Sequence, residues 1–294
     1  MLRRFDLAEG TDERVVRLPS VDVVAPIGGG RLAYVTTADG DPGDEDFVPN
    51  PELHVRELNG NDTTIGPGLS PLWHPDADRL AYLEPQQTRV CEGEVCEESS
   101  SVVVADVEEQ TRRTVLPPGG GWTLLGWLGD DLVVADREAP STVLVRGVGE
   151  VEKLDPAPNE FWGGSPDGRW IVRVSGDEAW LESPREGSRR RAIDFDGRAL
   201  GEGAWAPKGD RFAAVILGRT GAELGLVGLS GEVQPVEGSR GASGPILWSP
   251  EGRSFVYTRS DRLRLEAVHC KLEESCETLF SWPRGVTMLA LESR

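Results

Sequence analysis

The sequence predicts an all-β fold, a β-propeller of four-stranded blades, and two features of the chain support this prediction. Short apolar segments run along the whole length, and the 36 Gly and 21 Pro of its 294 residues are spread between them. A short motif that contains tryptophan also recurs at intervals of roughly 37 to 54 residues. Many short strands separated by turn residues are typical of all-β proteins, and the interval fits one four-stranded blade. We expect a single domain over residues 1–294.

The repeat is clearest in four segments, each with a proline-containing turn in front of an apolar stretch. They read WHPDADRLAY at 73–82, GSPDGRWIV at 164–172, WAPKGDRFAA at 205–214 and WSPEGRSFVY at 248–257. Two weaker copies are RLAY at 31–34, which recurs letter for letter at 79–82, and WLGDDLVV at 127–134. Six copies predict six blades before the chain ends are considered.

Each residue type of the motif has a structural role in a blade. Tryptophan ends the inner strand, where its ring can fill the space between neighbouring blades. Proline presets the turn, the acidic residue accepts backbone N–H groups, and glycine supplies a positive φ. The following apolar stretch, such as Phe255-Val256-Tyr257, forms the second strand. We therefore interpret the tryptophans and acids of the motif as scaffold.

The Trp-Ser-Pro-Asp/Glu-Gly-Arg pattern resembles the repeat of TolB-type β-propellers, a family with WD-like repeats that is common in bacterial envelope and secreted proteins. The resemblance covers nearly the whole chain and is strongest in the last three full copies. Gly28-Gly29-Gly30 and Gly129-Asp130-Asp131 depart from it, because they replace the turn of proline and acid. The departures leave the blade boundaries open at these two places. The resemblance implies a propeller that serves as a protein-interaction platform.

The two ends of the chain contain strands that six copies do not explain. Residues 2–7 and 13–18 read as the two outer strands of a blade, ahead of the first inner strand near 21–25. Residues 286–291 (VTMLAL) read as an inner strand that begins another blade. We expect the ends to combine in a seventh blade, closed by N- and C-terminal strands, because closure removes exposed sheet edges. Six blades with irregular extra strands are the alternative.

The four cysteines form two close pairs in the sequence, Cys91 with Cys96 and Cys270 with Cys276. Each pair spans an expected connection between strands of one blade. We therefore predict two local disulfides, which form where the surroundings are oxidising. One zinc site with four thiolates is disfavoured, because the two connections lie on opposite faces of a propeller. Reduced thiols in a cytoplasmic protein remain the alternative.

Residue patterns that carry enzyme chemistry are few in this chain. Three histidines occur, His54, His74 and His269, and they are scattered. His74 stands in the proline turn, where other copies have Ser or Ala, which favours a structural role. The sequence contains no Gly-x-Ser-x-Gly elbow, no phosphate-binding loop and no dinucleotide fingerprint. We therefore expect no catalytic residue, no cofactor, no metal site and no enzymatic activity.

Two charged segments are candidate ligand sites. Residues 39–46 (DGDPGDED) are dense in oxygen donors that could bind Ca²⁺, but Pro42 and Gly43 interrupt the spacing of an EF-hand loop. A solvated acidic loop is the favoured interpretation. Residues 188–191 (SRRR) could form a nucleic-acid patch, but a hairpin with a charged solvent face explains them better in so acidic a chain.

The net charge of −19, from 50 acidic and 31 basic residues, argues against two classes of partner. A surface this negative repels phosphate backbones and anionic lipid, so we expect no nucleic acid and no direct insertion into a membrane. No apolar run approaches the length of about 18 residues that a membrane span needs. The N-terminus has no apolar core of a signal peptide behind its two arginines.

These expectations favour a binding or sensing module over an enzyme. We expect a non-enzymatic β-propeller of a bacterial cell envelope or secreted protein that binds a protein or a small ligand at one face. The long connections 37–52 and 85–100 are the expected contact surface. The alternatives are a propeller enzyme of the lyase or glycosidase kind, with its active site at the channel mouth, and a cytoplasmic scaffold.

Overall fold

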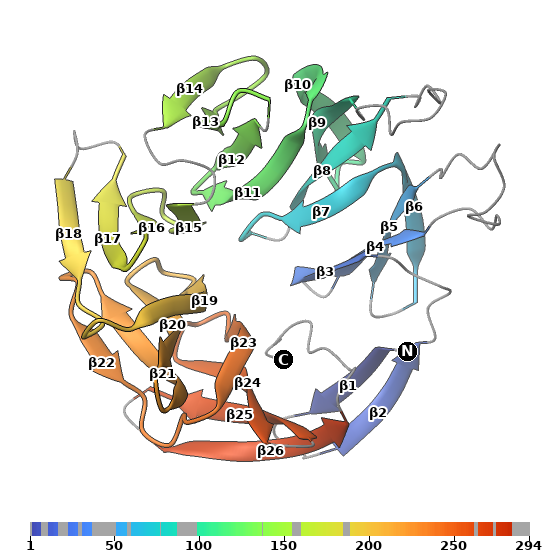
Figure 1. Ribbon diagram of the computed structural model, residues 1–294. Coiled ribbons are helices and arrows are strands. Elements are labelled where there is room, and N and C mark those ends of the chain that lie inside the picture. Colours follow the sequence, from blue (N-terminus) through green and yellow to red (C-terminus); the bar gives the residue numbers. More distant parts are fainter. Residues whose placement is uncertain are drawn as a thin grey trace, which may run out of the picture. The chain divides into compact units, whose positions relative to one another are not determined.

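The computed structural model shows the chain as a series of β-strands (Figure 1). It describes residues 2–6, 11–16, 23–28, 31–36, 51–57, 60–76, 78–86, 99–136, 138–154, 160–184, 189–261, 264–272 and 275–283. Before Arg31 the description covers the backbone alone. Within these ranges no helix is long and apolar enough to cross a membrane.

The strands form six four-stranded sheets, and the fold is a six-bladed β-propeller (Figure 1). In each sheet the strands lie in the order of the chain. Blade 1 contains β3 (Val23–Gly28), β4 (Arg31–Thr36), β5 (Glu52–Glu57) and β6 (Asp62–Pro67), blade 2 contains β7 (Leu69–Trp73), β8 (Arg79–Pro85), β9 (Ser99–Asp106) and β10 (Thr111–Gly120), and blade 3 contains β11 (Trp122–Leu128), β12 (Asp131–Asp136), β13 (Ser141–Val145) and β14 (Val151–Leu154). Blade 4 contains β15 (Phe161–Gly164), β16 (Ile171–Ser175), β17 (Glu178–Ser183) and β18 (Arg189–Ile193), blade 5 contains β19 (Ala199–Trp205), β20 (Arg211–Gly218), β21 (Gly221–Gly228) and β22 (Val233–Pro235), and blade 6 contains β23 (Ala242–Trp248), β24 (Ser254–Asp261), β25 (Arg264–Lys271) and β26 (Cys276–Pro283).

The N-terminal strands do not add a seventh blade to the described part of the chain. β1 (Leu2–Asp6) and β2 (Thr11–Val16) pair antiparallel with each other and form a two-stranded sheet. Seven blades are therefore not supported. The described strands form six blades, which is the alternative given above. The terminal segments have the alternation of strands, but two strands alone do not make a four-stranded blade. The closing strand expected at residues 286–291 lies outside the described residues.

The chain divides into two compact units, and each is considered by itself. Unit 1 comprises Met1–Leu124 and Leu132–Lys153, and unit 2 comprises Leu125–Asp131 and Leu154–Arg294. Blades 1 and 2 belong to unit 1, blades 4 to 6 belong to unit 2, and the strands of blade 3 are divided between the units. The single domain expected over residues 1–294 stays a prediction.

Apolar side chains fill the space between successive blades within each unit. The central strands are buried on both faces, as the uninterrupted burial of residues 32–35 in β4 shows, and such strands have continuous apolar runs. In unit 2, Phe212 of β20 packs in the cluster between blades 4 and 5, and Phe255 of β24 packs in the cluster between blades 5 and 6. In unit 1 the cluster between blades 1 and 2 contains Ala33, Val35, Leu53, Val55, Leu80, Tyr82, Val103 and Ala105.

In blades 5 and 6, the tryptophan that ends the inner strand links its blade to the preceding one. Trp205 of β19 donates its indole N–H to the carbonyl of Gly163 in β15 at 3.2 Å, and Trp248 of β23 donates to the carbonyl of Ala204 in β19 at 3.0 Å. The inner strands β15, β19 and β23 are accordingly neighbours in unit 2. At these two positions the motif tryptophan supplies both apolar area and a directed hydrogen bond to the same contact.

Candidate functional site

The acid of the repeated motif is held inside its own turn. In blade 4 the Ser165 hydroxyl donates to Asp167 Oδ1 at 2.6 Å and accepts the backbone N–H of Trp170 at 2.9 Å. Arg169 Nε donates to Asp167 Oδ2, also at 2.6 Å. Burial raises the pKa of the Asp167 carboxyl, but the hydrogen bonds from Ser165 and Arg169 outweigh burial and hold the pKa below its ordinary value. Asp167 is therefore ionised at neutral pH and engaged in the scaffold.

His74 takes the place of that serine in blade 2. Its side chain is 6% exposed, and its Nδ1 accepts the backbone N–H of Asp76 at 3.1 Å. Arg79 Nη2 lies 2.9 Å from His74 Nε2 and donates to Asp76 Oδ2 at 2.9 Å. Burial raises the pKa of Asp76, whereas hydrogen bonds from Arg79, the backbone and His74 lower it below its ordinary value. The histidine, the acid and the arginine together hold this turn.

His54 of β5 lies in a polar cluster of blade 1. Its ring stacks on Tyr34 of β4 with the centroids 4.9 Å apart, and its two nitrogens lie 2.9 Å from Thr36 Oγ1 and 3.2 Å from Thr64 Oγ1. The Tyr34 hydroxyl donates to Asp62 Oδ2 at 2.7 Å. Burial and the Asp62 carboxylate raise the pKa of Tyr34 to about 12. Tyr34 therefore stays protonated at neutral pH and acts as a hydrogen-bond donor.

The three histidines all have partners on their own blades. His269 of β25 lies with its Nδ1 3.6 Å from Glu277 Oε1 on the neighbouring strand β26. His54 and His74 have the partners given above, in blades 1 and 2. In the described part of the chain each histidine therefore contacts neighbours within its own blade.

Blade 4 contains a charged cluster that was not predicted from the sequence. Arg173 of β16 donates from Nη2 to Glu160 Oε2 at 2.6 Å and from Nη1 to Glu182 Oε2 at 3.2 Å. Ser175 donates to Glu160 Oε1 at 2.7 Å. The side chains of Arg173 and Glu182 are only 13% and 8% exposed. Each charge is therefore stabilised mainly by its ion-pair partners instead of by water. An arginine in the middle of the short strand Ile171–Ser175 was the available signal.

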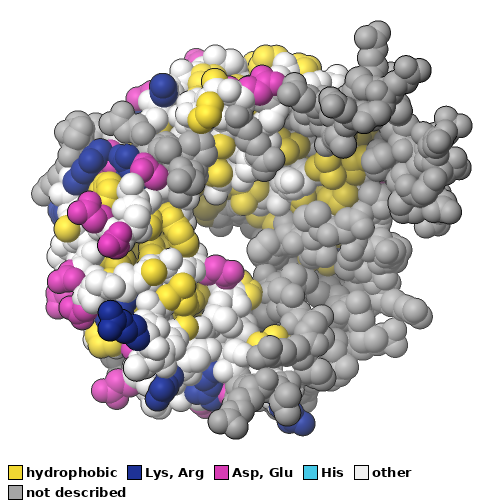
Figure 2. Space-filling view, in the orientation of Figure 1, with side chains coloured by type: hydrophobic (Ala, Val, Ile, Leu, Met, Phe, Trp, Pro, Cys, Tyr) yellow, Lys and Arg dark blue, Asp and Glu magenta, His cyan; other side chains and the backbone are white. Residues whose placement is uncertain are grey.

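The basic run of the sequence is used within the blades. Arg190 of β18 lies with its Nε 3.3 Å from Glu182 Oε2. The Arg191 guanidinium lies 4.8 Å from the ring centroid of Trp170 and donates to the carbonyl of Leu229 in blade 5. Figure 2 shows basic and acidic side chains interspersed over the strands of unit 2 on the face in view. The arginines therefore serve contacts within unit 2.

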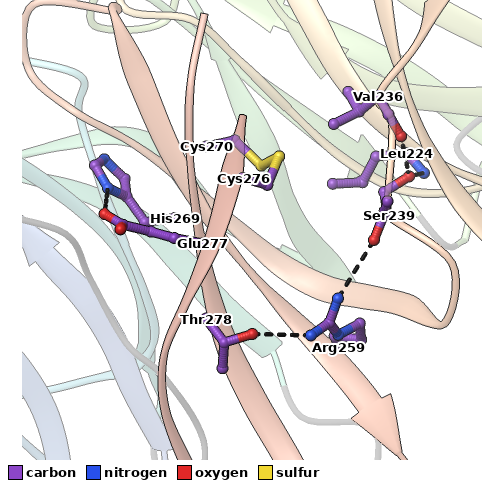
Figure 3. Close-up of a disulfide and its surroundings, with 10 residues drawn as sticks. Leu224, Val236, Ser239, Arg259, His269, Cys270, Cys276, Glu277 and Thr278 are labelled. Carbon is purple, nitrogen blue, oxygen red and sulfur yellow. Dashed lines mark hydrogen bonds and ion pairs between the residues drawn. A yellow bond between two sulfur atoms is a disulfide. The ribbon is translucent and has the colours of Figure 1, made fainter. Parts of the chain in front are cut away.

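A disulfide joins Cys270 of β25 to Cys276 of β26 in the outer hairpin of blade 6 (Figure 3). The two residues are partners in the strand register, with their Cα atoms 4.2 Å apart. Cys270 is 2% exposed and packs in the apolar cluster between blades 5 and 6. Nearby, Arg259 of β24 donates to Thr278 Oγ1 at 2.9 Å and to the carbonyl of Gly238 at 3.3 Å. The disulfide and Arg259 both fasten the outer strand to the rest of unit 2.

Several predicted sites lie outside the described residues. They include Cys91 and Cys96, the acidic segment 39–46, and most of the connections 37–52 and 85–100. The disulfide between Cys91 and Cys96 and the two interpretations of the acidic segment stay predictions.

Comparison with known proteins shows the fold and no closer relationship. No family model matches the sequence, and no curated protein matches it. Among solved structures, TolB from Acinetobacter baumannii is similar with a TM-score of 0.55 and 16% identity over 89% of this chain and 65% of that chain. The acylaminoacyl peptidase of Pyrococcus horikoshii has a TM-score of 0.59 and 14% identity over 95% of this chain and 49% of that one. A chain of the mitotic checkpoint complex has a TM-score of 0.59 and 15% identity over 98% of this chain and 86% of that chain.

These similarities define the class of protein. The chain is a β-propeller, because structures with little sequence in common align with nearly its whole length. It spans about half of the peptidase chain and 65% of the TolB chain. At such low identities the similarity establishes the fold but not the function, since one fold hosts many functions.

Proposed function

We propose that this chain is a TolB-type propeller that serves as a non-enzymatic binding module outside the cytoplasm, in the bacterial periplasm, at the cell surface or as a secreted protein. The observation that carries the proposal is the disulfide between Cys270 and Cys276. Disulfides form and persist in oxidising compartments and are rare in the cytosol. The repeated proline-acid-glycine turn and the structural similarity to TolB support the family part of the proposal.

The engagement of the polar side chains supports binding rather than catalysis. Asp167 is held by Ser165 and Arg169, and Arg173 is held between two glutamates. Groups that are paired in this way stabilise the blades and leave contacts with other molecules to the connections between strands. A rigid scaffold that presents variable connections is a common design of binding proteins.

The proposed contact surface lies at two long connections of unit 1. β4 ends at Thr36 and β5 begins at Glu52, and β8 ends at Pro85 and β9 begins at Ser99. Both connections therefore join the second strand of a blade to its third, in adjacent blades. Their sequences are acidic (DGDPGDED and CEGEVCEE), so the partner we propose is a cationic protein surface.

The compartment is tested by the oxidation state of the cysteines in cells. The tagged protein is purified from its native host after blocking of free thiols, and its intact mass and peptides are compared before and after reduction. We expect linked peptides with Cys270 joined to Cys276. Recovery of both residues as blocked thiols would remove the proposed location.

The contact surface is tested by changing its charge. Asp39, Asp41 and Asp44 are replaced by Asn, and proteins that copurify from envelope fractions are quantified by mass spectrometry. The control replaces the same number of exposed acids elsewhere by Gln: Glu109, Glu150 and Glu232. We expect loss of a copurifying protein with the first variant and its retention with the control. Equal behaviour of the two variants contradicts this surface.

A further inference from the structure

Trp73, Trp205 and Trp248 occupy the same position of the repeated motif but differ in their hydrogen bonds. Trp205 and Trp248 donate to carbonyl groups of the preceding blade. The Nε1 atom of Trp73 in blade 2 is buried and has no hydrogen-bond partner in the described structure. The contact between blades 1 and 2 therefore lacks a bond that the contacts between blades 4 and 5 and between blades 5 and 6 possess.

The missing bond is not explained by a missing neighbour. The inner strands β3 and β7 lie side by side in unit 1, and Trp73 packs against the apolar cluster that blades 1 and 2 share. A donor that is buried without an acceptor loses its bonds to water and receives nothing in return. Separation of blade 1 from blade 2 returns this N–H to water, whereas separation at Trp248 breaks a formed bond.

Among the described residues, a polar contact between blades 1 and 2 depends on charge. Arg31 of β4 lies with its Nη2 3.0 Å from Glu108 Oε1 and its Nη1 3.7 Å from Asp78 Oδ1, both in turns of blade 2. The two carboxylates are more than half exposed. Ion pairs to exposed groups are weakened by salt, whereas the indole bonds of unit 2 are neutral.

We propose that the propeller has a built-in opening between blades 1 and 2, which parts before the contacts between blades 4 and 5 and between blades 5 and 6, and which salt promotes. The opening is a local unfolding, in which the flanking strands β4 and β8 also lose part of their backbone pairing. In the open form the shared apolar cluster, which includes the fully buried Leu53 and Tyr82, becomes accessible to water.

Hydrogen exchange measures the opening directly in the full chain. Mass spectrometry follows the peptides of β4 and β8, which flank the contact between blades 1 and 2, and those of β20 and β24 in unit 2. We expect exchange about tenfold faster in the first pair, with a larger difference at about 0.5 M than at about 0.05 M NaCl. Equal rates, or rates in β4 and β8 that do not respond to salt, overturn the proposal.

Matched variants test its cause. Trp73→Phe, Trp205→Phe and Trp248→Phe remove the same ring volume, but only the last two remove a formed hydrogen bond. We expect Trp73→Phe to lower the melting temperature by less than half as much as each of the others. An equal loss shows that the Trp73 N–H is bonded in solution and overturns the argument.

A charge variant tests the salt response without touching the tryptophans. In Arg31→Met we expect exchange of β4 and β8 to be fast at both salt concentrations. An unchanged salt response in this variant overturns the role of Arg31. Exchange of the wild-type chain remains decisive if one of the variants does not fold.

Discussion

The carboxylate of Asp167 in the turn of blade 4 lies against the α-carbon of Gly209 in the turn of blade 5. A methyl group on Gly209 would lie 2.8 Å from Asp167 Cγ, and Gly209 also has a φ of +67°. The glycine of the motif is thus required twice, by its own turn and by the approach of the neighbouring turn. Gly252 in blade 6 has the same φ and faces Pro207 of blade 5.

Gly209→Ala is expected to lower the free energy of unfolding by about 2 to 4 kcal/mol, from the left-handed backbone and the contact with Asp167 together. Gly176→Ala is the matched control, because Gly176 has a φ of +61° and no atom within 4 Å of the added methyl group. The control isolates the backbone cost of about 1 kcal/mol. Urea unfolding measures both. Equal losses would mean that the two turns move apart at no cost.

Arg173→Met is expected to cost about 3 to 5 kcal/mol, because it leaves Glu160 and Glu182 without their shared cation. Arg211→Met is the control, since Arg211 pairs with Asp210 at 3.1 Å in an exposed position. Such a pair contributes about 0 to 1 kcal/mol. Chemical unfolding of both variants at pH 7 provides the comparison. A small loss at Arg173 would show that solvent reaches the two glutamates in the folded protein.

All three tyrosines of the chain are expected to titrate above pH 10. Burial is the main cause for Tyr82 and Tyr257, whose pKa values are raised, and burial with Asp62 raises the pKa of Tyr34 to about 12. Absorbance at the tyrosinate band should therefore stay low at pH 10 in the folded protein. The protein in guanidinium serves as the control and should titrate near the ordinary value of 10.

The same shifts set the direction of alkaline unfolding. A folded pKa above the unfolded one means that protons bind more tightly in the folded state. The stability that this supplies is complete below pH 10 and is lost as the pH rises through 10 toward the folded values. Tyr34→Phe should flatten this loss. An unchanged slope between pH 10 and 12 would contradict the raised pKa of Tyr34.

Removal of the disulfide in Cys270→Ala/Cys276→Ala is expected to cost about 2 kcal/mol, because the bridge closes a short loop. Thermal unfolding with and without a reductant measures the effect. The double variant also isolates the other pair, since any remaining response to reductant comes from Cys91 and Cys96. No remaining response would contradict a second disulfide.

The motif copies predict the propeller architecture from the sequence, because each residue type in them favours a particular local structure. A tryptophan, a proline and a glycine at fixed spacing specify a strand end and a turn wherever they occur, as at Trp248 and Gly252. The number of blades is harder to predict. Whether strands from the two chain ends pair is a long-range property, and the alternation of apolar and polar residues does not encode it. The terminal segments therefore led to seven blades where the described strands make six.

The contacts of the charged groups in blade 4, by contrast, cannot be predicted from the local sequence. The register of β16 with β17 places Arg173 opposite Trp180, and Glu182 lies two residues farther along β17 on the same face of the sheet. Glu160 lies before β15 and meets Arg173 through the pairing of β15 with β16. Contacts of this kind depend on which strands are neighbours, so composition and spacing do not reveal them.

The indole bonds between blades also have a direction along the chain. The acceptor carbonyls of Gly163 and Ala204 precede their donors by 42 and 44 residues. During synthesis from the N-terminus, each acceptor leaves the ribosome about one blade before its donor. A nascent blade of unit 2 therefore lacks this hydrogen bond until the first strand of the next blade has been translated. A pause in translation within that interval would leave the blade without the bond.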